Sequence, residues 1–240
     1  MTLKVHDQNL QLLYSLKLGD GCFVTSSTGG RFGTVTYYSS CSSVNLDYIS
    51  HKKSVLDKLG IYTRPISDKG KSGYKKDSKI YYFWTRVHPL ITKVGNMSVL
   101  EILDNIDKEG LVYFFLDDGT FHQNKHFGHI YCNTFNDEEV EKLIDVMFHF
   151  YPQKRCVKRV DRKKDGRQYP YIYIPVVVMN EFKKDVQKFL EDNEIYSLLY
   201  KVGGSKWHSR KWIILGIPFS ELVPNHINWE SLVNSYQDDK

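Results

Sequence analysis

LVYFFLDDG, residues 111–119, is the stretch that decides the fold, and LYSLKLGDG, residues 13–21, repeats its pattern. Each is an apolar run that ends in an acidic residue followed by glycine. The apolar positions are dense enough for a helix that is buried on more than one side, and the terminal glycines suit the end of a helix and the turn after it. The sequence therefore predicts two buried helices that end at Asp20 and Asp118.

The two acidic residues indicate a cation site. A carboxylate at the C-terminal end of a helix meets the negative end of the helix dipole and carbonyl groups without partners, so its position is unfavourable unless a cation binds there. Carboxylate and carbonyl oxygens select Mg²⁺ or Ca²⁺ over softer metals. If the two helix ends lie side by side, Asp20 and Asp118 would form a Mg²⁺ site divided between two repeats.

Composition limits the classes of protein to which the chain can belong. It has 240 residues, 41% of them hydrophobic, and no apolar stretch long enough to span a membrane. No charged and then apolar leader opens the sequence, so we expect an intracellular protein of the cytoplasm or an organelle matrix, without membrane association. The four cysteines include no CxxC pair, which favours reduced thiols over a zinc knuckle or a disulfide framework. A net charge of +5 is too small to indicate nucleic-acid binding by itself.

Basic residues are instead concentrated in two segments, at equivalent places in the two halves. Residues 64–79 hold six basic residues against two aspartates, and residues 154–167 hold eight against two. Each segment forms the loop and flanks of two strand-like runs. We therefore expect two positively charged hairpin tips that could hold phosphate groups.

The order of the expected elements is the same in both halves. In the first half it is a helix over 5–19, a hairpin around Gly29 and Gly30, a helix over 43–59 and two strands around the basic loop. In the second half it is the motif helix, a hairpin over 120–133, a helix over 136–151, two strands around the basic loop and a helix over 179–190. PLITKVGN and SLLYKVGG mirror each other near the two ends, which makes Lys93 and Lys201 equivalent by position.

This internal repeat predicts the fold class. We expect an α+β protein of two pseudo-symmetric αββαββα repeats that pack through the two motif helices and form a concave β-saddle. The expected boundaries are 1–96 for the first repeat, 97–203 for the second and 204–240 for a C-terminal extension without a counterpart in the first half.

At this point the chain resembles the LAGLIDADG homing endonucleases, specifically the single-chain type with two motifs. Position eight of each motif, the metal-binding acid of the family, falls on Asp20 and Asp118. The segments CNTFNDEEVEKLIDVM, YIYIPVVVMNEF and SLLYKVGG match the second half of that family in order, and the resemblance covers most of residues 10 to 203. The chain departs from the family at motif positions two and three, which are glycine or alanine there and Tyr14, Ser15, Val112 and Tyr113 here.

The resemblance implies a site-specific endonuclease that acts as a monomer. It would cut both strands of a long asymmetric DNA target across the minor groove, with Mg²⁺, and leave short 3′ overhangs. Asp20 and Asp118, with the carbonyl groups of Gly19 and Asp117, would bind the metal. Lys93 and Lys201 resemble the site lysines of the family, and Asn133 falls near a family glutamine that orients solvent.

The front of the saddle would then lie in the DNA major groove, where polar side chains on a β-ribbon can read base edges and basic tips can hold phosphates. In the strand 168–175, Ile172 and Ile174 share one face and Tyr171 and Tyr173 share the other. The expected DNA contacts are Thr25, Ser27, Arg31, Thr34, Thr36, Tyr38, Arg64, Lys69, Lys71, Lys75, Lys76, His122, Asn124, Lys125, Lys154, Lys158, Arg162, Lys163, Lys164, Arg167, Gln168, Tyr171, Tyr173, Lys206 and Arg210.

Other interpretations remain open from the sequence alone. The same basic saddle could serve an intron RNA maturase or a DNA-binding protein that does not cleave. FFLDDGT could be the Asp-Asp turn of a polymerase palm, although the chain is short for that fold. His122, His126, His129 and Cys132 suggest a zinc site, but they alternate poorly for one tetrahedral centre. Each Asp-Gly could also be only a helix end and turn, Asp117 could be structural at its side chain, and the lysines could be ordinary surface residues.

Overall fold

The computed structural model describes residues 10–26, 35–69, 79–162 and 166–203. No helix among them is long and apolar enough to cross a membrane. The expected C-terminal extension and ten of the expected DNA contacts lie outside the described residues: Ser27, Arg31, Thr34, Lys71, Lys75, Lys76, Lys163, Lys164, Lys206 and Arg210.

Both repeats have the predicted order of elements. The first consists of α1 (Gln11–Leu18), β1 (Cys22–Thr25), β2 (Tyr37–Ser43), α2 (Leu46–Lys58), β3 (Ser67–Lys69), β4 (Ile80–Trp84) and α3 (Pro89–Asn96). A short helix, α4 (Val99–Leu103), leads to the second repeat. That repeat consists of α5 (Lys108–Asp118), β5 (Gly119–His122), β6 (Phe127–Tyr131), α6 (Asp137–Phe150), β7 (Val157–Arg162), β8 (Gln168–Ile174) and α7 (Val176–Asp192), followed by the 3₁₀ helix η2 (Tyr196–Val202). The αββαββα prediction is therefore confirmed.

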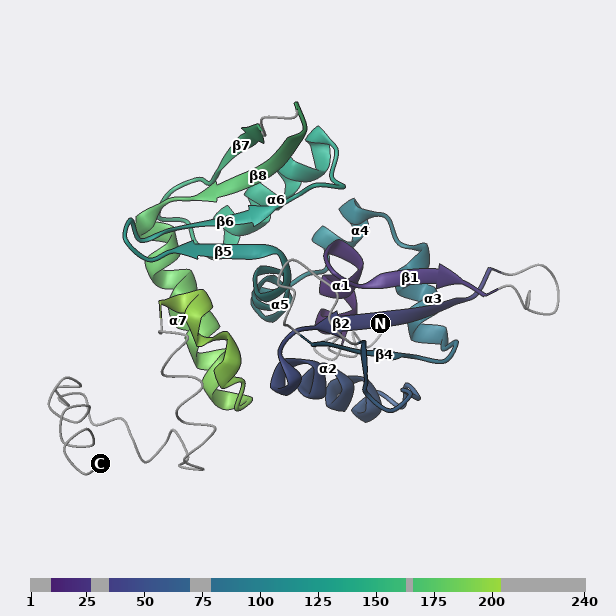
Figure 1. Ribbon diagram of the computed structural model, residues 1–240. Coiled ribbons are helices and arrows are strands. Elements are labelled where there is room, and N and C mark those ends of the chain that lie inside the picture. Colours follow the sequence, from purple (N-terminus) through teal and green to yellow (C-terminus); the bar gives the residue numbers. More distant parts are fainter. Residues whose placement is uncertain (1–9, 27–34, 70–78, 163–165, 204–240) are drawn as a thin grey trace, which may run out of the picture.

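Each repeat forms an antiparallel sheet of four strands with the same connectivity. The orders are β1-β2-β4-β3 and β5-β6-β8-β7. The registers also correspond, because Ser40 pairs with Cys22 and Trp84 in the first sheet as His129 pairs with Thr120 and Tyr173 in the second. In Figure 1 the two sheets lie on opposite sides of α1 and α5, which meet at the centre of the molecule.

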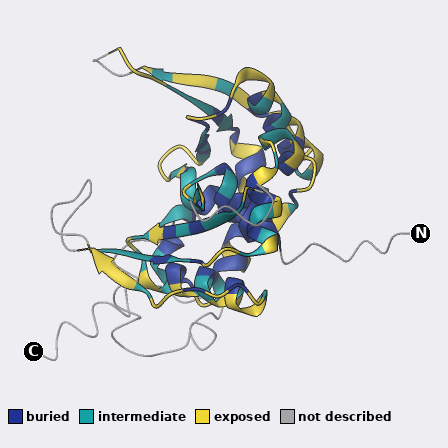
Figure 2. Ribbon diagram, turned by 90° about the vertical axis from the view of Figure 1, so that its right-hand side faces the viewer, coloured by how far each residue is buried: buried dark blue, intermediate teal, exposed yellow. Residues whose placement is uncertain are grey.

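The two motif helices form the centre of the core. Every residue from Leu111 to Leu116 is buried, and so is every residue from Leu12 to Leu16. Figure 2 shows buried residues gathered on the central helices, whereas the outward ends of the hairpins are exposed. Burial on all sides explains why neither motif shows the one-sided pattern of a surface helix.

Glycines allow the motif helices to approach each other at both ends. A Cβ atom on Gly110 would lie 2.6 Å from Oε1 of Gln11, at the start of the helix pair. Gln11 also accepts a hydrogen bond from the backbone of Asp107 at 2.9 Å and donates one to the carbonyl of Asn105 at 3.2 Å. A Cβ atom on Gly19 would lie 3.3 Å from the Phe114 ring at the other end. The close contacts are thus at the ends of this helix pair, which accommodates larger side chains at motif positions two and three.

Local capping fixes the start of two helices, α6 and α4. The expected capping box of α6 is present: Asn136 accepts from the Glu139 backbone at 3.0 Å, and the Glu139 carboxylate accepts from the Asn136 backbone at 2.7 Å. Ser98 and Glu101 form a second capping box at α4. These reciprocal bonds satisfy donors that would otherwise lack partners in the first turn.

Replacing Gly110 with alanine tests the close contact between the motif helices. Alanine favours a helix over glycine by about 1 kcal/mol, but its Cβ atom would collide with Gln11 and with Ile106 Cγ1, 2.5 Å away. We expect a net loss of about 1–3 kcal/mol in the free energy of unfolding, measured by urea denaturation. Ser54→Ala on the exposed face of α2 is the control and should change stability by less than about 0.5 kcal/mol. An equal or higher stability for Gly110→Ala would contradict the packing.

Candidate metal and nucleic-acid site

The C-terminal ends of α1 and α5 bring the two motif aspartates into one site. Gly19 caps α1, and a Cβ atom at that position would lie 2.2 Å from Oδ2 of Asp118. A side chain at position 19 would therefore displace the Asp118 carboxylate at the point where the two motif helices meet. Asp20 follows immediately and acts electrostatically on Asp118. Two residues from opposite halves of the chain are neighbours, as the cation-site interpretation requires.

Burial and neighbouring acids destabilise the ionised form of both motif aspartates. Burial, with the charges of Asp20 and Asp117, raises the pKa of Asp118 to about 7 from an ordinary value of 3.8. The pKa of Asp20 is also raised, mainly by desolvation and then by Asp117, although the residue itself retains exposure to solvent. Lys201 and Lys52 oppose both increases. The site therefore has an excess of negative charge in a partly desolvated place.

Asp118 also has an unused acceptor. Its Oδ2 atom is buried and lacks a hydrogen-bond partner in the part of the chain that the structure describes. A buried carboxylate oxygen without a partner is unfavourable, because it has lost water and gained nothing in exchange. This oxygen is therefore a ready ligand for a cation. Side chains alone do not complete a metal site, because the described residues contain no group of three or more His, Cys, Asp and Glu side chains that could hold a metal.

Asp117 has a different role at its side chain. Both of its carboxylate oxygens accept from the ammonium group of Lys52, at 2.6 and 2.9 Å, and both side chains are almost fully buried. Only the carbonyl group of Asp117 is left as a possible metal ligand. Sequence reasoning missed Lys52, although its spacing of four from Tyr48 and from Leu56 places it on the buried face of α2.

The two predicted site lysines lie in unlike surroundings. Lys201, in η2, donates a hydrogen bond to the carbonyl of Gly119, directly after the second motif helix. Lys93 is exposed in the last turn of α3. The helix that corresponds to α3 in the second repeat is α7, whereas η2 comes after it. The positional equivalence of Lys93 and Lys201 is therefore wrong. The two similar sequences belong to different elements, the helix α3 in the first repeat and the 3₁₀ helix η2 in the second.

A pocket of about 260 Å³ adjoins Asp20. Its polar lining comes from the end of β2, the start of α2 and η2: Ser42, Ser43, Asn45, Tyr48, Tyr200 and Lys201. Asn133 is instead exposed in the turn between β6 and α6. The hydroxyl groups at the end of β2 were not singled out from the sequence, since serine in a strand carries no local signal of a site.

In the first sheet, the alternation of side chains separates the predicted contacts by face. Cys41 and Phe83 are buried toward the helices, so Tyr38 and Trp84 face the opposite side, which we call the saddle face. The registers place Lys69, paired with Ile80, on the saddle face too. Thr36 lies on that side as well, because Tyr37 packs against Gly95 of α3. Thr25 pairs with Tyr37 and so lies on the helix side, contrary to the expected contact.

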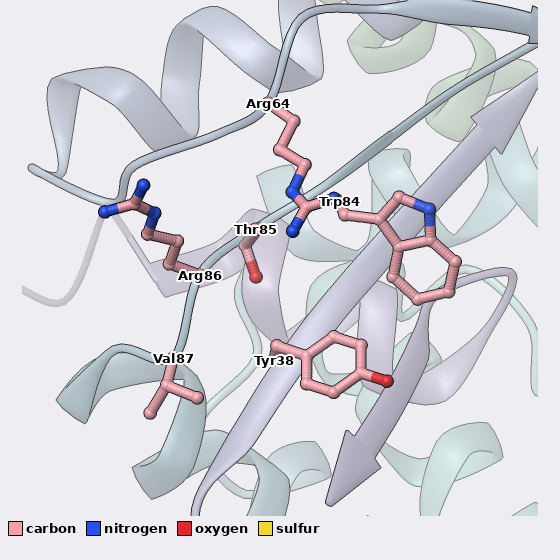
Figure 3. A pocket seen from close by; sticks show the side chains of 6 residues that line it. All are labelled: Tyr38, Arg64, Trp84, Thr85, Arg86 and Val87. Carbon is pink, nitrogen blue, oxygen red and sulfur yellow. The ribbon is translucent and has the colours of Figure 1, made fainter. Parts of the chain in front are cut away.

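A pocket of about 560 Å³ opens on the saddle face of this sheet. Tyr38 and Trp84 form one wall, with ring centroids 5.6 Å apart. Figure 3 shows the Arg64 side chain extending toward Trp84, whereas Arg86 points away from the two rings. Arg86 instead stacks on Tyr62, 4.4 Å from the ring centre. An aromatic wall beside a guanidinium group suits a base or phosphate ligand.

In the second sheet, Ile172 and Ile174 are fully buried and Tyr171 and Tyr173 lie on the saddle face, as the alternation predicts. The register places Lys158 opposite Ile172, on the helix side, where it pairs with Asp137 of α6. Three of the expected DNA contacts lie on the helix side and not on the saddle face, contrary to the prediction: Lys158, Arg162 and Gln168. The other expected contacts are on the saddle face or in exposed turns and ends: His122, Asn124, Lys125, Lys154, Arg167, Tyr171 and Tyr173.

The saddle face of the second sheet carries a continuous aromatic array that the sequence prediction mostly missed. Phe127 lies 4.4 Å from His122 and 5.1 Å from Tyr173, and His129 lies 4.3 Å from Tyr171, measured between ring centroids. The guanidinium group of Arg159 lies 4.1 Å from the Tyr173 ring centre. Burial, and then the neighbouring His122 and Arg159, lower the pKa of His129 to about 4, so the His129 ring is neutral at physiological pH.

Two alternatives from the sequence do not match this geometry. FFLDDG lies at the end of the helix α5, whereas the polymerase-palm interpretation places it in a turn. His122 and His129 do meet, with Nε2 and Nδ1 3.2 Å apart, but Cys132 is buried and donates to the Ile130 carbonyl. The described residues therefore do not form the zinc site.

Comparison with known proteins agrees with this architecture. The structure is similar to that of the homing endonuclease I-WcaI bound to its DNA recognition sequence, with a TM-score of 0.60 and 21% identity over 82% of this chain and 86% of that one. It is also similar to I-DmoI in complex with DNA and Mn, with a TM-score of 0.50 and 15% identity over 74% of this chain and 96% of that one. A variant of I-DmoI with its target DNA in the presence of Mg gives a TM-score of 0.50 and 14% identity, over 75% and 98% of the chains. At these identities the likeness shows the fold alone.

No curated protein sequence matches the chain. The family model of the LAGLIDADG DNA endonucleases, however, matches residues 10–182, which include both motif helices and both sheets. The chain belongs to the LAGLIDADG DNA endonuclease family.

Proposed function

We propose that this protein is a site-specific homing endonuclease that makes Mg²⁺-dependent double-strand breaks in a long asymmetric DNA target and leaves short 3′ overhangs. The observation that carries the proposal is the meeting of Asp20 and Asp118 at the ends of two buried helices. The solved structures of I-WcaI with its DNA and of I-DmoI with DNA and Mn support it through the shared fold.

The residues at the helix ends fit a divalent cation. Their oxygens are hard ligands, the carboxylates repel each other, and Asp118 Oδ2 has lost water without gaining a partner among the described groups. Asp20 and Asp118 would hold the metal, with the carbonyl groups of Gly19 and Asp117. When bound, the metal would stabilise charge on the phosphate and activate water for hydrolysis.

The chain's own residues then account for the remaining steps. Asp20 and Asp118, one from each repeat, would hold the cation at the pseudo-twofold axis, so one monomer can act on both strands. Lys201, held at the Gly119 carbonyl, places a positive charge beside the phosphate and opposes the charge of both acids. Hydroxyl groups of Ser42 and Ser43 in the adjoining pocket can hydrogen-bond solvent or phosphate oxygens. Lys93 and Asn133 remain candidates for a role in cleavage, and both are exposed to solvent.

DNA would lie across the saddle faces of the two sheets. Arg64 and Lys69 in the first repeat, and Arg159 in the second, provide positive charge on these faces. Arginine can read guanine in the major groove, and aromatic side chains make apolar contact with thymine methyl groups. The two sheets carry different side chains at equivalent register positions, so we expect the two halves of the target to differ in sequence.

A maturase that binds intron RNA is the second candidate. The aromatic array on the second saddle face favours it, because unstacked RNA bases stack on such side chains. Tight RNA binding without DNA cleavage in any divalent metal would favour this function over the nuclease.

Replacing either motif aspartate with asparagine tests the nuclease. Targets would first be selected by incubating the protein and Mg²⁺ with plasmids that carry randomised inserts. On a selected plasmid, Asp20→Asn and Asp118→Asn should each slow linearisation by at least about 100-fold, because metal-bound charge stabilisation contributes several kcal/mol. Asp145→Asn, in an exposed ion pair with Arg155, should cut like the parent. Undiminished cutting by the double variant Asp20→Asn, Asp118→Asn would reject these residues as ligands.

The raised pKa values predict how pH affects stability without metal. An acid whose pKa is raised by folding binds its proton more tightly in the folded state, so its contribution lowers the free energy of unfolding as pH rises from about 4 to about 7. Asp118→Asn removes this loss. The metal-free variant should therefore melt at a higher temperature than the parent near pH 8, with the difference vanishing near pH 4.

Ca²⁺ binding tests the same site in the absence of DNA, because carboxylate and carbonyl oxygens are its usual ligands. Ca²⁺ should raise the melting temperature of the parent near pH 8 and leave that of Asp118→Asn unchanged. An equal Ca²⁺ effect on both proteins would show that the ion binds elsewhere.

Adjacent residues of β7 test the DNA surface. Arg159 lies on the saddle face, whereas Lys158 points to the helices and pairs with Asp137. Arg159→Ala should weaken binding of a selected target in Ca²⁺. It should also lower the slope of log affinity against log salt concentration by about one, as expected for the loss of one phosphate contact, while Lys158→Ala should do neither. Fluorescence anisotropy at several salt concentrations measures both. The reverse ranking would mean that DNA does not lie on this face.

A further inference from the structure

The Lys52–Asp117 ion pair is buried and joins the two repeats. Lys52 belongs to α2 of the first repeat, and Asp117 belongs to the second motif helix. Their side chains are 1% and 3% exposed, and the ammonium group also lies 4.3 Å from the ring centre of Tyr48. Removing two charges from water costs free energy that their attraction barely recovers, so stability alone is a weak reason for such a pair.

The same face of α2 makes further polar contacts with the second repeat. Asp47 accepts a hydrogen bond from the backbone of Ser197 in η2 at 2.8 Å, and the Ser197 hydroxyl donates to it as well. His51 and the Tyr113 hydroxyl share a hydrogen bond of 2.7 Å. One helix of the first repeat is thus attached to α5 and η2, the two elements that carry Asp118 and Lys201.

The other half of the site cannot have this ion pair. In the first motif, the position that corresponds to Asp117 is Gly19, which has no side chain. Counted from the helix caps Asn45 and Asn136, the residue of α6 that corresponds to Lys52 is Leu143, which is fully buried. The repeats share a fold, but among the described residues a buried ammonium group holds the end of the second motif helix and not that of the first.

We propose that Lys52 is a positioning residue: by holding the Asp117 side chain, it keeps the Asp117 carbonyl and the Asp118 carboxylate in place for a cation, and it makes the two halves of the site unequal. The consequence for cleavage rests on the proposed nuclease function. Asp117 directly precedes Asp118 at a helix end, where the last carbonyls lack helical partners and the backbone is least constrained. The pair also keeps the Asp117 carboxylate turned away, so that a third acidic side chain does not compete for the cation.

The double variant Lys52→Met, Asp117→Leu tests this role. It replaces both partners with apolar side chains and so leaves neither of their charges unpaired in the core, so it should fold, whereas Lys52→Met alone leaves Asp117 buried and unpaired and should melt at a lower temperature. Lys53→Met is the matched control, because Lys53 is the next residue on α2 and pairs with the exposed Asp57.

Two readouts separate positioning from a purely structural role. The first is titration with Tb³⁺, a hard cation whose luminescence is sensitised by nearby tyrosine such as Tyr48 or Tyr200 of the adjoining pocket. Loss of a group that orients a metal ligand typically weakens metal binding by about 10–100-fold, so the double variant should bind Tb³⁺ at least about tenfold more weakly than the parent and Lys53→Met should not. The second is cleavage of a supercoiled target plasmid in Mg²⁺. If the halves are unequal, the double variant should accumulate nicked circles, whereas a general loss of folded protein would slow both cuts equally.

Unchanged Tb³⁺ affinity in a folded double variant, with the parent ratio of nicked to linear DNA, would overturn the proposal. Should the parent bind Tb³⁺ but cut no DNA, the nuclease function fails, while the Tb³⁺ comparison still decides whether Lys52 positions the site. A parent that binds no Tb³⁺ would reject the metal site and the role of Lys52 together.

Discussion

The structure depends on holding two negatively charged helix ends against each other. The carboxylates of Asp20 and Asp118 lie where two helix dipoles and the negative charge of Asp117 all disfavour them, and burial raises the pKa of both. Nothing local can maintain such an arrangement. It persists because α1 and α5 are buried along their length and packed through glycine contacts at both ends, so that separating the carboxylates would require opening the core.

The stabilising interactions and the site are therefore closely linked. Leucine and phenylalanine side chains of the motif helices supply apolar burial, and Gly19 and Gly110 allow the close approach. Lys52 adds an interaction that burial cannot supply, since it opposes the negative charge from behind the site and binds the side chain of Asp117. A cation at the front would oppose the remaining repulsion. Without a bound cation, the arrangement of these acidic groups is electrostatically unfavourable.

The two repeats share a backbone plan but have different surfaces. At corresponding register positions, Ser40 in the first sheet is replaced by His129 in the second, and Tyr38 by Phe127. The first saddle face offers a pocket with Arg64, and the second offers an aromatic array with Arg159. Because a fold of this kind fixes where side chains point but not what they are, a single chain can present two different faces to an asymmetric ligand.

The sequence by itself determined the repeat, the order of elements, the two motif helices and the acids that end them, because these follow from local periodicity, capping and glycine placement. It also determined the alternation of Ile172 with Tyr171, which strand geometry imposes. Only the tertiary structure decided which charged residues lie close together and which face of a sheet they occupy. Lys52 lies against Asp117 and Lys201 lies against the Gly119 carbonyl, and Lys158 points to the helices whereas Arg159 points to the saddle face. These outcomes depend on strand register and on how one repeat packs on the other, which are set by contacts between residues far apart in the chain and leave no local pattern to read.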